Sequence, residues 1–252
     1  MRPRGDGLSK VGLLQLDPTV GDLEQNSHRL ARLAKQAEAA GAALGVSTEL
    51  AVCGYPPRDL LMERDFVERS MDVALNIPTD LPVLVGTPIP AEDDRTLPTN
   101  GVVRAGPQVA TITGDEHSRI VAEKQLLPTY DVFDEARYFA AKNRSGLARS
   151  IGGLTLGVTV CEDAWQSSGM TPSSYAQDPI EHIAGWCRQG VEINATVNLS
   201  ASPFHTDKFT TRLEVARHAA SVLNHPFLLA NQVGGNDDLL FDGRSLVAWP
   251  DG

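Results

Sequence analysis

Long hydrophobic runs are missing from this sequence. Its longest apolar stretches are strand-sized and are interrupted by glycine or polar residues, whereas a membrane helix needs roughly 20 consecutive apolar residues. The first ten residues, MRPRGDGLSK, are basic at the start but lead into VGLLQL without the apolar region of a secretory signal. We therefore expect no membrane span and a cytoplasmic location.

Cysteine is also scarce, and the pattern of the few that occur excludes two kinds of structure. Cys53, Cys161 and Cys187 are an odd number without a CxxC spacing, which argues against a disulfide framework and against a structural zinc site. The six histidines form no HExxH pattern or other close metal-ligand spacing. The sequence therefore predicts reduced thiols and no metal site.

Positive charge is in short supply as well. The formal net charge is -10 and the sequence pI is near 5.0, and no basic run is interleaved with aromatic residues. A surface of this charge would be repelled by a phosphate backbone. We expect no nucleic-acid partner.

The chain does have enough apolar content for a substantial core. Of its 252 residues, 42% are hydrophobic, and a chain of this length can fold as one domain. No internal repeat or Ser/Gly-rich linker marks a boundary, and AEDDRTLPTN at residues 91–100 is typical of a polar loop. We expect a single domain over residues 1–252.

Strand-like segments rich in Val, Ile, Leu and Thr dominate the pattern. They lie at residues 11–16, 43–49, 82–87, 101–104, 109–113, 154–161, 192–199, 227–232 and 245–249. The segments 101–104 and 109–113 predict a hairpin, because only the short turn Ala105-Gly106-Pro107 and one further residue separate them.

Helical patterns lie between several of these strands. Apolar residues at positions 30, 33, 37 and 40 share one helical face, with Asn26 or Ser27 as the expected N-cap and Gly41 at the stop. Further helices are predicted at residues 65–75, 180–188 and 211–223. Alternating helices and strands together with a hairpin predict an α/β fold with a mixed sheet.

Three polar residues stand where chemistry is possible. Glu49 ends the strand-like ALGVSTEL, at the edge where α/β sheets place active sites. Cys161 follows the strand-like GGLTLGVTV, where a strand-to-helix elbow would put backbone N–H groups near its sulfur and favour a thiolate. Lys124 lies in RIVAEKQLLP. Taken singly, each also fits a structural role, as a solvated strand-end charge or a buried thiol.

The other cysteines have weaker contexts. Cys187 lies within the helical pattern HIAGWCRQG, and Cys53 lies in a turn beside Gly54. A cysteine nucleophile usually needs a base, most commonly histidine, but no histidine has a local context that suggests this role. Composition and spacing lead no further.

The ordered set Glu49, Lys124 and Cys161 resembles the catalytic triad of the nitrilase superfamily of carbon-nitrogen hydrolases. Further segments are similar to the glutaminase domain of glutamine-dependent NAD synthetases: VGLLQLDPTVGDLEQN, GYPPRDLL, KQLLPTYDVFDEARYF, CEDAW, NLSASPFHTDK and FDGRSLVAWPDG. The resemblance covers essentially the whole chain. The GYPP-D-LL and LP-Y-FDE-RYF strings favour this branch over generic nitrilases.

The resemblance implies a role for each member of the triad. Cys161 would be the nucleophile, Glu49 the general base, and Lys124 the group that stabilises the oxyanion. Glu135 in FDEARYF matches a second glutamate that is common in the superfamily. The glutaminase step would need no cofactor.

A second set of residues matches positions that contact glutamine in similar NAD synthetases: Tyr55, Tyr130, Ser202 and Lys208. Lys208 stands where relatives often have arginine, so a bidentate grip on the substrate carboxylate is not implied. Thr48 likewise precedes Glu49 where proline is commoner.

The implied fold is a four-layer αββα sandwich, which usually assembles into homo-oligomers through its helical faces. Nitrilase domains commonly continue with further strand after a segment like FDGRSLVAWPDG, so residues 1–252 are expected to lack the last strands. The SGGxDS signature of the synthetase half is absent. That half, as a domain or a subunit, would bind ATP with Mg and deamido-NAD.

Two other interpretations compete with the glutaminase hypothesis. The chain could be a free-standing amidase of the same superfamily that acts on another small amide, which a preference for glutamine would exclude. It could also be a noncatalytic α/β scaffold that retains the triad only by descent, in which case Cys161 would be inert towards a glutamine-like electrophile.

Overall fold

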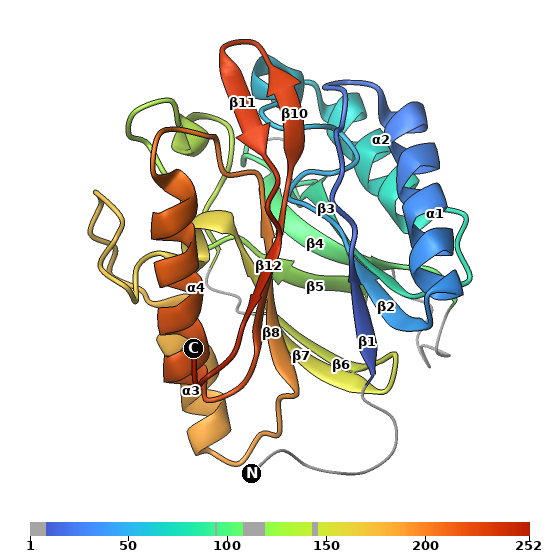
Figure 1. Ribbon diagram of the computed structural model, residues 1–252. Coiled ribbons are helices and arrows are strands. Elements are labelled where there is room, and N and C mark those ends of the chain that lie inside the picture. Colours follow the sequence, from blue (N-terminus) through green and yellow to red (C-terminus); the bar gives the residue numbers. More distant parts are fainter. Residues whose placement is uncertain (1–8, 94, 108–118, 143–145) are drawn as a thin grey trace.

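Two mixed sheets lie at the centre of the molecule (Figure 1). The computed structural model describes residues 9–93, 95–107, 119–142 and 146–252. The first sheet has the order β1-β2-β3-β4-β5, with β1 Lys10–Leu13, β2 Ala42–Val46, β3 Val83–Ile89, β4 Thr99–Ala105 and β5 Ile120–Glu123. The second has the order β12-β9-β8-β7-β6, with β6 Gly146–Ile151, β7 Leu154–Val160, β8 Ala195–Ser200, β9 Phe227–Asn231 and β12 Leu246–Ala248.

Helices cover the outer face of each sheet (Figure 1). The first sheet packs against α1 Leu23–Ala39 and α2 Arg64–Leu75, and the second against α3 Pro179–Arg188 and α4 Lys208–Leu223. None of the described helices combines the length and the apolar composition needed to cross a membrane.

Three separate apolar cores define four layers. Val83 packs in the outer core with the helices, whereas its neighbour Leu84 packs in the core between the sheets, because successive strand side chains point to opposite faces. The central core joins Leu84 to Val158 of the second sheet, and the third core joins Phe227 to the helices α3 and α4. The arrangement is the expected αββα sandwich.

Parallel strands bring the chemically interesting segments to one edge. Strands β1, β2 and β3 run parallel in the first sheet, as do β7, β8 and β9 in the second. The segments that follow β2, β7 and β8 therefore leave their sheets at carboxyl ends, where α/β folds place ligands. A separate hairpin, β10 Val233–Asn236 with β11 Leu239–Asp242, projects beyond the sheets (Figure 1).

Most of the predicted elements are confirmed, and their ends account for most of the differences. Every predicted strand within the described residues overlaps an observed one, and the four predicted helices are present. The segment 109–113 lies outside the described residues. The pattern misses strands β5, β6, β10 and β11, because β5, β10 and β11 have only four residues each, β10 is rich in glycine, and β6 (GLARSI) contains few β-branched residues.

The start of the first helix was predicted wrongly. The helix begins at Leu23, with Asp22 as the N-cap accepting a hydrogen bond from the backbone N–H of Gln25. Asn26, one of the two expected caps, is instead fully buried, and its side-chain amide donates to the carbonyls of Thr19 and Val52. The physical reason is tertiary, since Val52 belongs to a distant segment.

Candidate active site

Glu49 lies in a turn just beyond β2 and is fully buried. The predicted strand 43–49 is therefore too long, since β2 ends at Val46. Three donors hold the Glu49 carboxylate: Oε1 accepts from Asn100 Nδ2 and Lys124 Nζ, both at 2.8 Å, and Oε2 accepts from the backbone N–H of Ala201 at 3.0 Å. The interpretation of Glu49 as a water-facing carboxylate is wrong.

Lys124 follows β5 directly and is also fully buried. Its ammonium nitrogen lies 2.8 Å from Glu49 Oε1 and 2.7 Å from Glu135 Oε2. Burial works against the charge of Lys124, but the carboxylates of Glu135 and Glu49 outweigh it and raise its pKa well above the usual value. Lys124 is therefore a charged ammonium held between two glutamates, not a solvated surface lysine.

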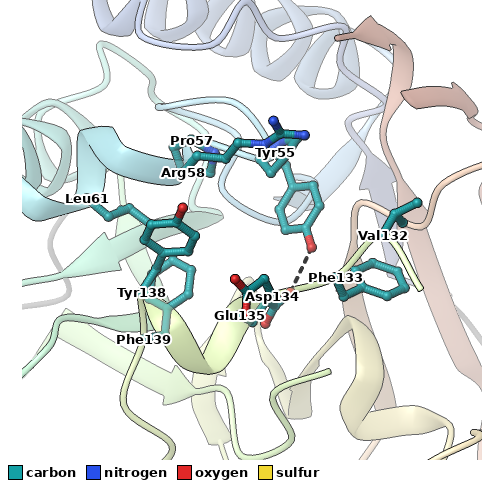
Figure 2. Close-up of a pocket in the computed structure, with 11 residues that line it drawn as sticks. Tyr55, Pro57, Arg58, Leu61, Val132, Phe133, Asp134, Glu135, Tyr138 and Phe139 are labelled. Atoms are coloured by element: carbon teal, nitrogen blue, oxygen red, sulfur yellow. Dashed lines mark hydrogen bonds between the residues drawn. The ribbon is translucent and has the colours of Figure 1, made fainter. Parts of the chain in front are cut away.

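Glu135 opens a short 3-10 helix and completes this ion network. Its Oε1 accepts a hydrogen bond of 2.8 Å from the hydroxyl of Tyr55. Burial raises the pKa of Glu135 to about 7, with Lys124 lowering it and Glu49 raising it. Figure 2 shows the Tyr55 phenol directed at Glu135, and both side chains line a cavity of about 220 Å³ together with Arg58 and Tyr138.

Cys161 stands at the predicted elbow. β7 ends at Val160, a 3-10 turn covers Cys161–Ala164, and Cys161 itself has φ 43, a left-handed conformation that is uncommon for a residue with a side chain. Cys161 as a whole is 6% exposed. This elbow resembles in outline the strained turns that present nucleophiles in other α/β enzymes.

The electrostatics of Cys161 differ from the expected ones. Burial raises the pKa of its thiol well above the usual value, the carboxylate of Glu49 raises it further, and the ammonium of Lys124 lowers it. A thiolate favoured by the turn was the prediction, but desolvation is the larger effect. The thiol is consequently protonated at rest, and any attack by its sulfur requires a base. The thiol therefore lies within electrostatic range of the Lys124–Glu49 ion pair.

A second cavity, of about 470 Å³, opens beside the elbow. Two of the predicted substrate residues line it, Tyr130 and Lys208, together with Trp165. The ammonium of Lys208 lies 4.2 Å from the centre of the Trp165 ring. Burial lowers the pKa of Lys208, and the sulfur of Cys161 acts in the opposite direction, so the cation lies within electrostatic range of the thiol.

Glu162 is a site residue that sequence reasoning missed. It directly follows Cys161, is 4% exposed, and accepts hydrogen bonds from the hydroxyls of Tyr130 at 3.0 Å and Thr171 at 2.6 Å. The CEDAW string contained it, but nothing in that string indicated burial. The carboxylate next to the thiol therefore holds Tyr130, which lines the same cavity as Lys208.

The remaining predicted residues lie in two places. Ser202 follows β8, is 4% exposed, and donates its backbone N–H to Asn231 Oδ1 at 2.9 Å. Tyr55 lies beside Glu135 and lines the 220 Å³ cavity, which shares Val132 and Phe133 with the cavity of Tyr130 and Lys208. Among the described residues, no group of three or more His, Cys, Asp or Glu is placed to hold a metal ion.

Comparison with known proteins assigns this chain to a family. The model of the carbon-nitrogen hydrolase family matches residues 10–252. The chain belongs to the carbon-nitrogen hydrolase family. Among curated members, the glutamine-dependent NAD(+) synthetase of Synechocystis is 37% identical, with a match that covers 94% of this chain and 42% of the relative. That of Thermotoga maritima is 33% identical, over 94% of this chain and 38% of the relative.

Solved structures agree with this family assignment. A glutamine-dependent NAD+ synthetase from Acinetobacter baumannii superposes with a TM-score of 0.76 at 25% identity, over 96% of this chain and 41% of that chain. An amidase from Nesterenkonia sp. superposes with a TM-score of 0.69 at 19% identity, over 95% of this chain and 82% of that chain, which shows the fold alone. The chain spans about two fifths of the length of these NAD synthetase relatives.

Proposed function

We propose that this chain is a glutaminase, which hydrolyses the side-chain amide of glutamine to glutamate and ammonia. The observation that supports it most is the buried network in which Lys124 joins Glu49 and Glu135 beside the thiol of Cys161. Burying charged groups costs free energy even when the groups are paired, so a stabilising role alone does not explain this network. Perturbed ionisable groups of this kind are typical of catalytic sites.

The first half of the reaction forms a thioester. Glu49 accepts the Cys161 proton, and the sulfur attacks the amide carbon, whose oxygen becomes an oxyanion. The Lys124 ammonium and the backbone N–H of residue 162 stabilise that oxyanion. When the tetrahedral intermediate collapses, the carbon-nitrogen bond breaks and the nitrogen leaves as ammonia with the proton returned by Glu49.

The second half releases the product. Glu49 takes a proton from water, the hydroxide oxygen attacks the thioester carbon, and a second oxyanion forms beside Lys124. Collapse of this intermediate breaks the carbon-sulfur bond, and the proton on Glu49 returns to the sulfur of Cys161. The products are glutamate and an enzyme restored to its starting state.

Charge near the thiol supports an amino acid as the substrate. The carboxylate of Glu162 suits the α-amino group of glutamine, and the cation of Lys208 suits its α-carboxylate. Both groups lie within electrostatic range of Cys161, and the 470 Å³ cavity that Lys208 lines has room for a small molecule. Tyr55, Tyr130 and Ser202 complete the proposed substrate contacts.

We further propose that the ammonia serves a synthetase domain or subunit, which amidates deamido-NAD to NAD with ATP and Mg. The names of the NAD synthetase relatives support this. Homo-oligomeric assembly stays a prediction of the resemblance, and a cytoplasmic location stays a prediction of the sequence pattern.

The direct test is ammonia release from glutamine and from other small amides, with the purified chain and with a synthetase present. We expect glutamine to be preferred. Equal turnover of simple aliphatic amides would instead favour the free-standing amidase. No turnover, together with an unlabelled Cys161 after exposure to a glutamine-like electrophile, would favour the noncatalytic scaffold.

Lys124→Met keeps an apolar stem of similar reach but removes the charge. Loss of one oxyanion donor typically raises the barrier by about 2.7 to 4 kcal/mol, so we expect turnover at saturating glutamine to fall by about 100-fold to 1,000-fold. Single-turnover measurement of ammonia release tests this. A near-normal rate at full substrate occupancy would contradict the electrostatic role.

Lys208→Ala and Glu162→Gln should weaken glutamine binding more than they slow chemistry. A hydrogen bond to a charged group contributes about 1.5 to 3 kcal/mol, so we expect KM for glutamine to rise by about 10-fold to 100-fold in each variant, while kcat changes less. Steady-state kinetics test this. An unchanged KM in both variants would show that Lys208 and Glu162 do not contact the substrate. Arg188→Ala, on an exposed part of α3, is the control and should leave KM unchanged.

A further inference from the structure

The side chain of Asp163 joins the segment that carries Lys124 to the segment that carries Cys161. It is 2% exposed. Its Oδ1 accepts hydrogen bonds from the backbone N–H groups of Gln125 and Leu126, both at 3.0 Å, and its Oδ2 accepts one from the N–H of Val160 at 3.1 Å. One carboxylate therefore connects two strand ends.

The Lys124 segment depends on this carboxylate because its sheet ladder stops there. The N–H of Lys124 donates to the carbonyl of Asn100 at 2.7 Å, which continues the pairing of β4 with β5. The next two amides, of Gln125 and Leu126, lie beyond β5 and are buried. A buried amide without an acceptor is costly, and Asp163 satisfies both.

The Cys161 segment depends on the same carboxylate for its turn. Val160 is the last residue of β7, and Cys161 then adopts its left-handed φ of 43. The bond from Val160 N–H to Asp163 closes the turn that holds this conformation. Conformations of this kind persist only where the surroundings enforce them.

We propose that Asp163 is a positioning residue that sets the distance between the Lys124 ammonium and the Cys161 sulfur. The proposal rests on the proposed function only for its kinetic test, because the geometry concerns the two side chains themselves. A misplacement of about 1 Å at a catalytic group can cost about 100-fold in rate. The oxyanion forms between these two groups, so their spacing directly affects its stabilisation.

Asp163→Asn breaks the link without changing size. The amide keeps one oxygen, so it can accept from one segment but presents N–H groups to the other. We expect kcat for glutamine to fall by about 100-fold with KM changed by less than about threefold. We also expect the pH profile of iodoacetamide alkylation at Cys161, read on its peptide by mass spectrometry, to move to higher pH. In the parent protein the Lys124 ammonium lowers the thiol pKa, and the variant loses part of that effect.

Asp178→Asn is the matched control. Asp178 also accepts two backbone N–H bonds, from Ile180 and Glu181 at 3.1 Å, but it caps α3. The Asp178→Asn variant should have a lower melting temperature than the parent, with kcat and the alkylation profile of Cys161 unchanged. The same pattern in Asp163→Asn would show a purely structural role and overturn the proposal.

Two further outcomes are decisive. If Asp163→Asn does not fold, Asp163→Glu is used in its place, because it keeps the charge and both oxygens but moves them by one methylene. A normal kcat together with a normal alkylation profile in Asp163→Glu would refute the positioning role. If the parent protein does not hydrolyse glutamine, the proposed function fails, whereas the alkylation profile at Cys161 still tests the link through Asp163.

Discussion

Replacing Cys161 with alanine is expected to abolish ammonia release from glutamine while the fold remains intact. The change removes the atom that forms the thioester, and no other described thiol can substitute for it: Cys53 is fully buried near Gly54, and Cys187 lies on α3. Only one sulfur leaves the central core, so the loss of stability should be small. Ammonia release and the melting curve together test the expectation.

Cys187→Ala is the paired control and should remain fully active. Its thiol is only partly buried and lies on the outer helical layer, remote from the Glu49 carboxylate. A Cys161→Ala protein that retained activity within about threefold of the parent would exclude Cys161 as the nucleophile.

Glu49→Gln should slow both the attack by Cys161 and the hydrolysis of the thioester. General base catalysis typically contributes about 100-fold to 10,000-fold, and the protonated resting thiol makes this contribution necessary. A surface carboxylate would change stability by about 0.5 kcal/mol or less. Glu49 is buried and ion-paired with Lys124, so we expect a larger loss of stability as well.

The chemical defect can be separated from the folding defect by labelling. Mass spectrometry of folded protein treated with a glutamine-like electrophile should show an adduct on Cys161 that forms much more slowly in Glu49→Gln than in the parent. Glu123→Gln, which removes a half-buried carboxylate next to Lys124 that accepts from Thr99, is the control and should label normally. Equal labelling rates in the parent and Glu49→Gln would refute the Glu-Lys-Cys mechanism.

Local signals predicted where the candidate residues lie along the fold. Apolar strands before Glu49 and Cys161 indicated that both lie at strand ends, and the polar CEDAW string after a strand indicated the elbow. For Lys124 the local pattern was uninformative, because the short strand β5 before it was not predicted. There the family resemblance, and not the pattern, supplied the hypothesis.

Tertiary structure decided the environment of each group. The hydroxyl of Tyr55 meets Glu135, 80 positions away, and the N–H of Ala201 meets Glu49, 152 positions away. Long-range packing of this kind buries ionisable groups, and burial raises the pKa of the Cys161 thiol and of Glu135. The elbow alone predicts a thiolate, whereas burial and the nearby Glu49 carboxylate raise the pKa of the Cys161 thiol.

By itself, the sequence determined the α/β class, most of the strands and helices, and the strand-end positions of Glu49 and Cys161. These follow from the hydrogen-bonding preferences and side-chain periodicity of residues that are neighbours in the chain. Only the tertiary structure decided that Lys124 lies between two glutamates, that Glu162 holds the Tyr130 hydroxyl, and that Asp163 links two strand ends. The physical reason is that desolvation and charge pairing depend on which distant segments pack together, and no local pattern records that.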